Sequence, residues 1–183
     1  MPQPLPPPDA WQQGGGDLGA AIEALASAHR AGALLQVQPE RRSLEKARSK
    51  GLAKDQEGRL LRGAWKVALG ALAPGCVGRR TGWSTFGFVL AGTRGELETM
   101  GTQLVGMLLC DEDLGQWAWH VVLTEVFASE PERTLHCDPG YALAKATGKS
   151  AVAWVQPYSG ADWREPQRYP TVSLAVVEAT SGR

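Results

Sequence analysis

The chain has 183 residues, 43% of them apolar, and its formal net charge is zero at neutral pH. This length and apolar content allow a buried core and exclude a wholly disordered chain. The sequence has no apolar run of about 18 residues and no secretory signal at its start, which predicts a soluble cytoplasmic protein of bacterial type with no membrane contact. Three cysteines without CxxC spacing argue against a disulfide framework or a cysteine-based zinc site.

The ionised residues are unevenly distributed along the chain. Residues 30–80 carry twelve Lys and Arg against four Asp and Glu, whereas residues 94–138 carry two against nine. A charge asymmetry of this kind favours a polyanionic partner for the basic part.

Residues 1–16 are rich in Pro, Gly and Gln, and such a stretch cannot bury enough apolar surface to offset its ordering entropy. We therefore expect a disordered tail there, followed by a basic helical segment over residues 17–74. Asp17 is a good N-cap for the first helix of that segment.

Within residues 17–74, Leu34 to Gln38 is a possible short strand, and two helices follow it. The run from Glu40 to Lys50 forms the first, and Asp55 to Ala73 forms the second, which ends at Pro74. Helical spacing places three basic side chains of the longer helix on one exposed face: Arg59, Arg62 and Lys66.

Residues 75–183 read as an α+β core that forms one globular unit with residues 17–74. Thr93 and Glu96 form a capping box for a helix between the first two strands, and Asp138 with Pro139 begins a short helix that ends at Gly148. The predicted fold is a helical N-terminal half packed on a four-stranded sheet of β-α-β-α-β-β order. Its strands are Ser84 to Ala91, Trp117 to Phe127, Val152 to Val155 and Thr171 to Val177. Both faces of the second strand are apolar, as in an interior strand, and the last two strands form a hairpin with a long loop.

Two segments have the composition of an anion or nucleic-acid site. In the Gly-rich loop from Gly75 to Trp83, Arg79 and Arg80 offer guanidinium groups to phosphate, although a plain solvated turn explains the same residues. In the loop between the last two strands, aromatic and basic side chains alternate in a way that suits stacking on unpaired bases. The residues concerned are Tyr158, Trp163, Arg164, Arg168 and Tyr169. The structural alternative folds this loop back, with Trp163 on the core and Arg164 paired with Glu165 or Asp162.

Enzymatic chemistry has weaker support in the sequence. His120, His136 and Cys137 form the one plausible nucleophile and base set, but a thiolate beside Asp138 is disfavoured by like charge. Asp111 to Asp113 could bind a divalent cation, or could form a solvated acidic turn. Gly148-Lys149-Ser150 ends like a P-loop, but it lacks the earlier glycine and the strand-to-helix context.

We interpret the sequence as that of a non-enzymatic nucleic-acid-binding protein without cofactor or metal, which favours single-stranded DNA or RNA. Its predicted contacts come from the basic helix, the Arg79-Arg80 loop and the aromatic hairpin. A protein-interaction or self-assembly module, possible as a homo-oligomer, is the alternative. A small enzyme that uses Cys137 and a histidine is the second alternative.

Overall fold

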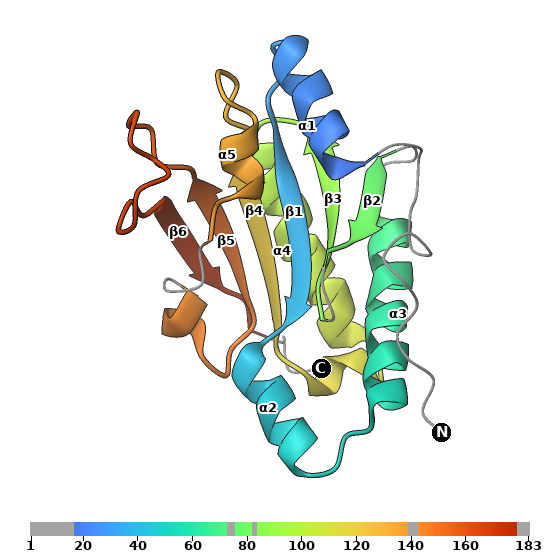
Figure 1. The fold of residues 1–183 in the computed structure, drawn as a ribbon. Helices are drawn as coiled ribbons and strands as arrows, with labels where there is room; N and C mark the ends of the chain where they lie inside the picture. The colour runs from blue at the N-terminus through green and yellow to red at the C-terminus, as the bar shows by residue number, and fades with distance from the viewer. Residues whose placement is uncertain (1–16, 73–75, 82–83, 139–142, 179–183) are drawn as a thin grey trace.

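The computed structural model describes residues 17–72, 76–81, 84–138 and 143–178 (Figure 1). The predicted tail, residues 1–16, lies outside the described residues. The strands are β1 (Gly32–Pro39), β2 (Val77–Arg80), β3 (Phe86–Ala91), β4 (Trp119–Glu125), β5 (Ala151–Gln156) and β6 (Thr171–Val176). The α-helices are α1 (Leu18–Ser27), α2 (Arg41–Ser49), α3 (Lys54–Ala71), α4 (Arg94–Cys110) and the short α5 (Glu132–Leu135). Two 3-10 turns, η2 (Leu114–Gln116) and η3 (Ala144–Ala146), complete the described elements.

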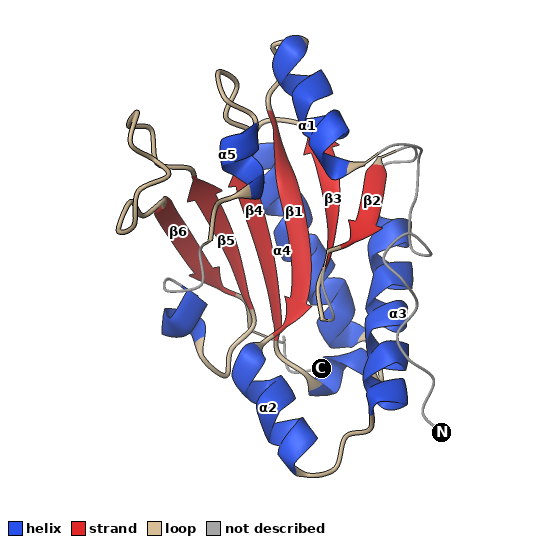
Figure 2. Cartoon of the chain, viewed as in Figure 1, coloured by secondary structure: helices blue, strands red, loops and turns tan. Residues whose placement is uncertain are grey.

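All six strands form a single sheet with the order β2-β3-β1-β4-β5-β6. Strands β4 and β5 are parallel, and every other neighbouring pair is antiparallel. The fold class is therefore mixed α and β, as predicted, and β5 and β6 are antiparallel neighbours with the long loop between them (Figure 2).

The predicted four-stranded sheet and helical N-terminal half do not match the structure exactly, although the strand predicted from Leu34 to Gln38 is part of β1. Strand β1 belongs to the N-terminal half and lies in the middle of the sheet, between β3 and β4, because its apolar side chains are buried there. Strand β2 was expected to be part of a loop because its four residues, Val-Gly-Arg-Arg, lack an apolar alternation. It forms a strand by pairing with β3.

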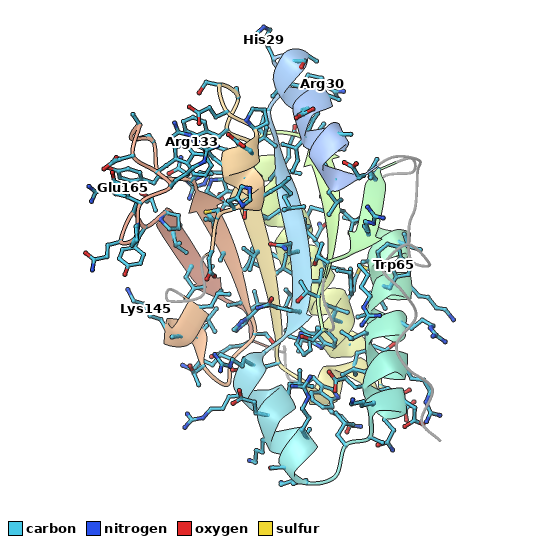
Figure 3. The ribbon with its side chains drawn as sticks, viewed as in Figure 1. His29, Arg30, Trp65, Arg133, Lys145 and Glu165 are labelled. Atoms are coloured by element: carbon cyan, nitrogen blue, oxygen red, sulfur yellow. The ribbon has the colours of Figure 1, made fainter. Side chains whose placement is uncertain are left out.

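One face of the sheet, here called the packed face, carries the main core. Alternate residues of β1, β3, β4 and β5 point to α3 and α4 from this face, and Trp65 of α3 stacks on Phe88 at 4.8 Å between ring centroids. Figure 3 shows Trp65 on the side of α3 that faces the sheet. Trp119 is fully buried here and donates its indole N–H to the Leu114 carbonyl at 2.9 Å, so β4 is the interior strand that the sequence predicts.

Among the described residues, the opposite face, here called the open face, is covered at its two sides. Figure 1 views the sheet from this face, with α1 across the upper ends of β1 and β3 and α5 beside β4. Helix α1 packs through Ile22 and Leu25 on Leu34 and Val89. The segment after α5 packs through Leu143 on β4 and β5. The polar side chains of β1 lie between α1 and the segment after α5.

The helix starts follow from local sequence. Asp17 accepts a hydrogen bond from the Ala20 amide at 2.6 Å and begins α1, and Thr93 and Glu96 form the predicted capping box of α4. The helix predicted from Asp138 to Gly148 is not formed as a whole: α5 precedes it, η3 occupies its end, and residues 139–142 lie outside the described residues. In the part of the chain that the structure describes, no helix is long and apolar enough to cross a membrane.

Candidate functional site

A polar groove of about 480 Å³ lies on the open face, between the β2–β3 hairpin and the segment that follows α5. Gln36 and Gln38 form its floor, because residues two apart on a strand point to the same face. Thr81 and Thr85 form one wall, and the Thr81 amide donates to the Thr85 carbonyl at 2.9 Å. The other wall is formed by Leu135, His136, Cys137, Asp138 and Leu143. The groove therefore combines amide and hydroxyl groups with few charges.

An arginine of β2, next to this groove, has a hydrogen-bond donor without a partner among the described residues. Arg79 pairs with Gly87 across β2 and β3, and Gly87 pairs with Gln36 across β3 and β1, so the three residues form one cross-strand row. The Nε of Arg79 is buried and has no hydrogen-bond partner among the described residues. A buried donor without a partner costs about 1 to 3 kcal/mol, and such groups commonly indicate an absent ligand or water.

A second cavity, of about 310 Å³, lies on the other side of the segment from His136 to Asp138. Its far wall is the loop between β5 and β6. The cavity is lined there by Tyr158, Trp163, Glu165, Arg168 and Tyr169, and on the near side by Arg133. His136, Cys137 and Asp138 line both cavities.

Arg133 holds the loop between β5 and β6 in place. It is only 5% exposed, and its guanidinium donates to the carbonyls of Tyr158 at 2.8 Å and Gly160 at 2.9 Å. The same guanidinium forms an ion pair with Glu130, which also accepts the indole N–H of Trp163 at 2.8 Å. The loop is thus tied to α5 by buried, charge-assisted hydrogen bonds.

The basic side chains of this loop form ion pairs with acidic neighbours. Arg164 pairs with Glu132, and Arg168 pairs with Asp162. The loop is therefore folded back on the protein, as in the structural alternative of the sequence analysis, although the ion-pair partner of Arg164 differs from those expected there.

The residues predicted to form one nucleic-acid surface lie on three separate parts of the molecule. Helix α3 is on the packed side of the sheet, with Arg59, Arg62 and Lys66 exposed to solvent and Arg59 paired with Asp55 at 2.9 Å. Arg80 is 5% exposed, and burial lowers the pKa of its guanidinium while the charge of Glu57 opposes that effect. Strand alternation places Arg79 on the open face instead. The loop residues Tyr158, Trp163, Arg164, Arg168 and Tyr169 lie beyond the opposite edge of the sheet (Figure 1).

Two features of the structure argue against the enzyme alternative. The His120 ring is buried, and its Nε2 is bonded to the Lys149 carbonyl at 3.0 Å and the Ala146 carbonyl at 3.3 Å. Burial and the charge of Asp138 raise the pKa of the Cys137 thiol from 9.0 to about 11, so the thiolate is scarce at neutral pH.

The acidic turn after α4 has a structural role. Asp111 accepts hydrogen bonds from the amides of Asp113 at 2.9 Å and Leu114 at 3.0 Å, which satisfies the start of η2. Across the described ranges, no group of three or more His, Cys, Asp or Glu side chains is arranged to hold a metal ion.

The sequence analysis did not identify the groove residues Gln36, Gln38, Thr81 and Thr85. One signal was available, since two glutamines spaced by two in the otherwise apolar run Leu-Leu-Gln-Val-Gln mark a polar patch on one face of a strand. The position of Thr81 and Thr85 opposite these glutamines depends on β2 pairing with β3, which the sequence did not indicate.

No protein-family model and no curated protein matches this chain. Several solved structures share its fold, and three of them are compared with it here. The GGDEF domain of DgcB from Caulobacter crescentus in complex with c-di-GMP matches with a TM-score of 0.55 and 15% identity, over 74% of this chain and 85% of that chain. The coiled coil and GGDEF domain of DgcB, also with c-di-GMP, match with a TM-score of 0.57 and 14% identity, over 70% and 72% of the two chains. The GGDEF domain of TpbB (YfiN) from Pseudomonas aeruginosa matches with a TM-score of 0.58 and 15% identity, over 80% and 87%.

These likenesses establish a GGDEF-like fold for the described part of the chain. They also correct the functional interpretation. The predicted binding of single-stranded DNA or RNA, and the prediction of nucleic acid as the partner, are wrong. The three structures compared here are GGDEF domains, and two of them hold c-di-GMP. Read as one-letter residue codes, the domain name spells Gly-Gly-Asp-Glu-Phe, and that string does not occur in the present sequence. Self-assembly stays a prediction.

Proposed function

We propose that this chain binds a guanine nucleotide of the c-di-GMP class in the polar groove of the open face. The single observation that carries the proposal is the buried, unpartnered Nε of Arg79 beside a groove of neutral hydrogen-bonding groups. The fold supports the choice of ligand, since two solved neighbours hold c-di-GMP.

The chemistry of the groove fits a nucleotide of low charge. Each of the two phosphodiesters of c-di-GMP carries one negative charge, and the Arg79 guanidinium can pair with one of them through charge-assisted hydrogen bonds. A guanine edge carries both donors and acceptors, and the amides of Gln36 and Gln38 and the hydroxyls of Thr81 and Thr85 offer both kinds of group. A nucleoside triphosphate would bring more negative charge than c-di-GMP to a groove that has Arg79 beside it and no lysine or arginine in its described lining.

The proposed activity is binding without turnover of the ligand. Phosphoryl transfer depends on divalent cations, which proteins hold next to phosphates through one or two carboxylates. Asp138 is the only acidic residue among those that line the described groove, and the sequence from Val77 to Ala91, which includes the β2–β3 hairpin, contains no Asp or Glu. The groove thus offers no pair of carboxylates for such a cation.

Isothermal titration of the full chain with c-di-GMP tests this proposal. We expect saturable binding, weakened about tenfold by Arg79→Gln, which removes one charge-assisted hydrogen bond worth about 1.5 kcal/mol. Gln38→Leu should also weaken binding. Arg62→Gln, on the exposed face of α3, is the matched control and should bind like the wild type. Absence of binding at about 1 mM ligand, a free energy weaker than about −4 kcal/mol, would contradict the proposal.

A further inference from the structure

Strand β6 forms one edge of the sheet and pairs with β5 on its inner side. Figure 1 shows β6 at the left side of the molecule, and no other described strand lies beyond it. Its side chains are exposed or half-buried, in contrast to those of β5, of which only Gln156 is exposed. A sheet edge of this kind offers its outer backbone groups to another strand.

The hydrogen-bond pattern shows which backbone groups of β6 face outward. Just after the strand, the Val177 amide donates to the Ser150 carbonyl at 2.9 Å, so these two residues form a hydrogen-bonded pair. Such pairs alternate with non-hydrogen-bonded pairs along an antiparallel ladder. The N–H and C=O groups of Val172, Leu174 and Val176 therefore point away from β5.

The sequence of β6 lacks the features that usually keep a sheet edge from pairing. Natural proteins protect such edges with charged residues, proline, bulges or very short strands. The six residues Thr-Val-Ser-Leu-Ala-Val include no charged residue and no proline, and their register with β5 has no bulge. Strand β2, at the opposite edge, has only four residues. Strand β6 is thus the longer edge and the one better suited to pairing.

We infer that β6 pairs with β6 of a second copy of this chain, in antiparallel orientation and with Leu174 at the two-fold axis. The same strand then serves both copies, as in other two-fold interfaces, and the two sheets become one continuous sheet. This interface goes beyond the proposed nucleotide binding and needs no ligand.

The side chains of β6 are complementary to themselves in this register. Leu174 lies opposite Leu174 of the second copy, and Val172 lies opposite Val176 of the second copy. All three side chains are on the open face, where Val176 is 44% exposed in the single chain. Apolar side chains that face each other on adjacent strands stabilise a sheet. On the other face, Thr171, Ser173 and Ala175 are small and leave the two strands free to approach.

Charged residues beyond the two ends of β6 favour the antiparallel orientation. The first ionised residue after the strand is Glu178, which is exposed, and the last one before it is Arg168, whose side chain is 38% exposed. Antiparallel pairing brings the Glu178 end of one copy to the Arg168 end of the other. Parallel pairing would bring the two Glu178 residues together, and like charges opposite each other destabilise a sheet.

Sedimentation equilibrium of the full chain without nucleotide tests the interface. We expect a monomer–dimer equilibrium whose dissociation constant rises about tenfold or more in Val176→Lys, because a lysine on an edge strand opposes pairing. Met107→Lys is the matched control, since Met107 is 43% exposed but lies on α4 and not at a sheet edge. This control should dimerise like the wild type. Thermal melting checks that each variant is folded.

Chemical cross-linking tests the register independently. The background is Cys110→Ser, which removes the exposed native cysteine. A short bismaleimide should link two copies of Leu174→Cys, because directly opposite residues of a hydrogen-bonded pair have Cα atoms about 5.5 Å apart. Thr171→Cys should not be linked. Thr171 lies opposite Val177 of the second copy, which places the two Thr171 positions about 20 Å apart along the ladder.

The outcomes decide the inference without reference to nucleotide binding. A monomeric mass at every concentration up to about 0.5 mM would overturn it and would leave the edge of β6 to a strand of another protein. A dimer that Val176→Lys does not weaken, or that is linked through position 171 and not 174, would also overturn it. A dimer that Val176→Lys weakens and Met107→Lys does not, and that is linked only through position 174, supports it.

Discussion

Arg79 and Gln36 lie on either side of Gly87 in one row of the sheet, on the face that α1 and α5 leave partly open. Gly87 has no side chain, so nothing from β3 stands between them on that face. The amide of Gln36 faces the groove, and the buried Nε of Arg79 has no partner among the described residues. This row connects the anion-binding group to the polar floor of the groove.

We predict that Arg79→Met leaves stability nearly unchanged while it weakens c-di-GMP binding. The substitution removes a buried donor that makes no hydrogen bond, and the methionine retains most of the apolar stem. The free energy of unfolding in urea should stay within about 0.5 kcal/mol of the wild type. A large loss of stability would show that the guanidinium is a structural group and not a ligand contact.

The matched substitution Arg133→Met should behave in the opposite way. Arg133 is buried, and its guanidinium bonds to Glu130 and to two loop carbonyls, so its removal leaves buried acceptors unpaired. We expect a loss of about 2 to 3 kcal/mol in urea unfolding. Faster hydrogen exchange of the loop amides should accompany that loss. Wild-type stability and exchange would contradict the role we assign to Arg133.

Gly78 tests the packing of β2 on the core. A Cβ at this position would clash with the Phe88 ring, which is fully buried and stacked on Trp65. Gly78→Ala should therefore lower stability by about 1 to 3 kcal/mol. Gly70→Ala, on α3 with nothing within 4 Å of the added Cβ, should instead raise it by about 0.5 to 1 kcal/mol. Equal effects of the two substitutions would show that β2 does not pack as described.

The Glu40 carboxylate makes the stability of the protein depend on pH in the acidic range. Burial acts to raise the pKa of its carboxylate, but hydrogen bonds from the amides of Arg42 and Ser43, the Ser43 hydroxyl and the Gly148 amide hold the pKa below its ordinary value of 4.5. A lowered folded-state pKa stabilises the protein above 4.5, and this stabilisation is lost as the pH falls through the folded-state pKa.

In Glu40→Gln that carboxylate is absent, so its melting temperature should fall less than that of the wild type as the pH drops below 4.5. Glu45 is an exposed residue of α2, the helix that Glu40 caps. The melting temperature of Glu45→Gln should depend on pH in the same way as that of the wild type. Parallel curves for the wild type and Glu40→Gln would contradict the assigned shift.

Sequence reasoning was strongest where local chemistry decides the structure. The caps at Asp17 and Thr93 and the buried strand around Trp119 depend on neighbours in the chain and on continuous apolar runs, and the structure confirms them. It was weakest where pairing between strands decides the structure. Val77–Arg80 is a strand because β3 pairs with it, and its two arginines then point to opposite faces.

The aromatic loop shows a different limit of sequence reasoning. Alternating aromatic and basic residues indicated a surface free to bind nucleic acid, but Arg168 pairs within the loop, with Asp162, and the acidic partners of Trp163 and Arg164 come from another part of the chain. Glu130 and Glu132, which bond Trp163 and Arg164, lie more than twenty residues earlier in the chain. No local pattern could reveal this pairing, which depends on the placement of α5 beside the end of β5.

Chemical-shift mapping of the isotope-labelled chain on titration with c-di-GMP tests the central claim most directly. We predict shifts of the side-chain amides of Gln36 and Gln38 and of the backbone amides of Thr81 and Thr85, with no shifts along the exposed face of α3. Shifts confined to α3, or unchanged spectra at about 1 mM c-di-GMP, would contradict the assignment of the open-face groove as the nucleotide site.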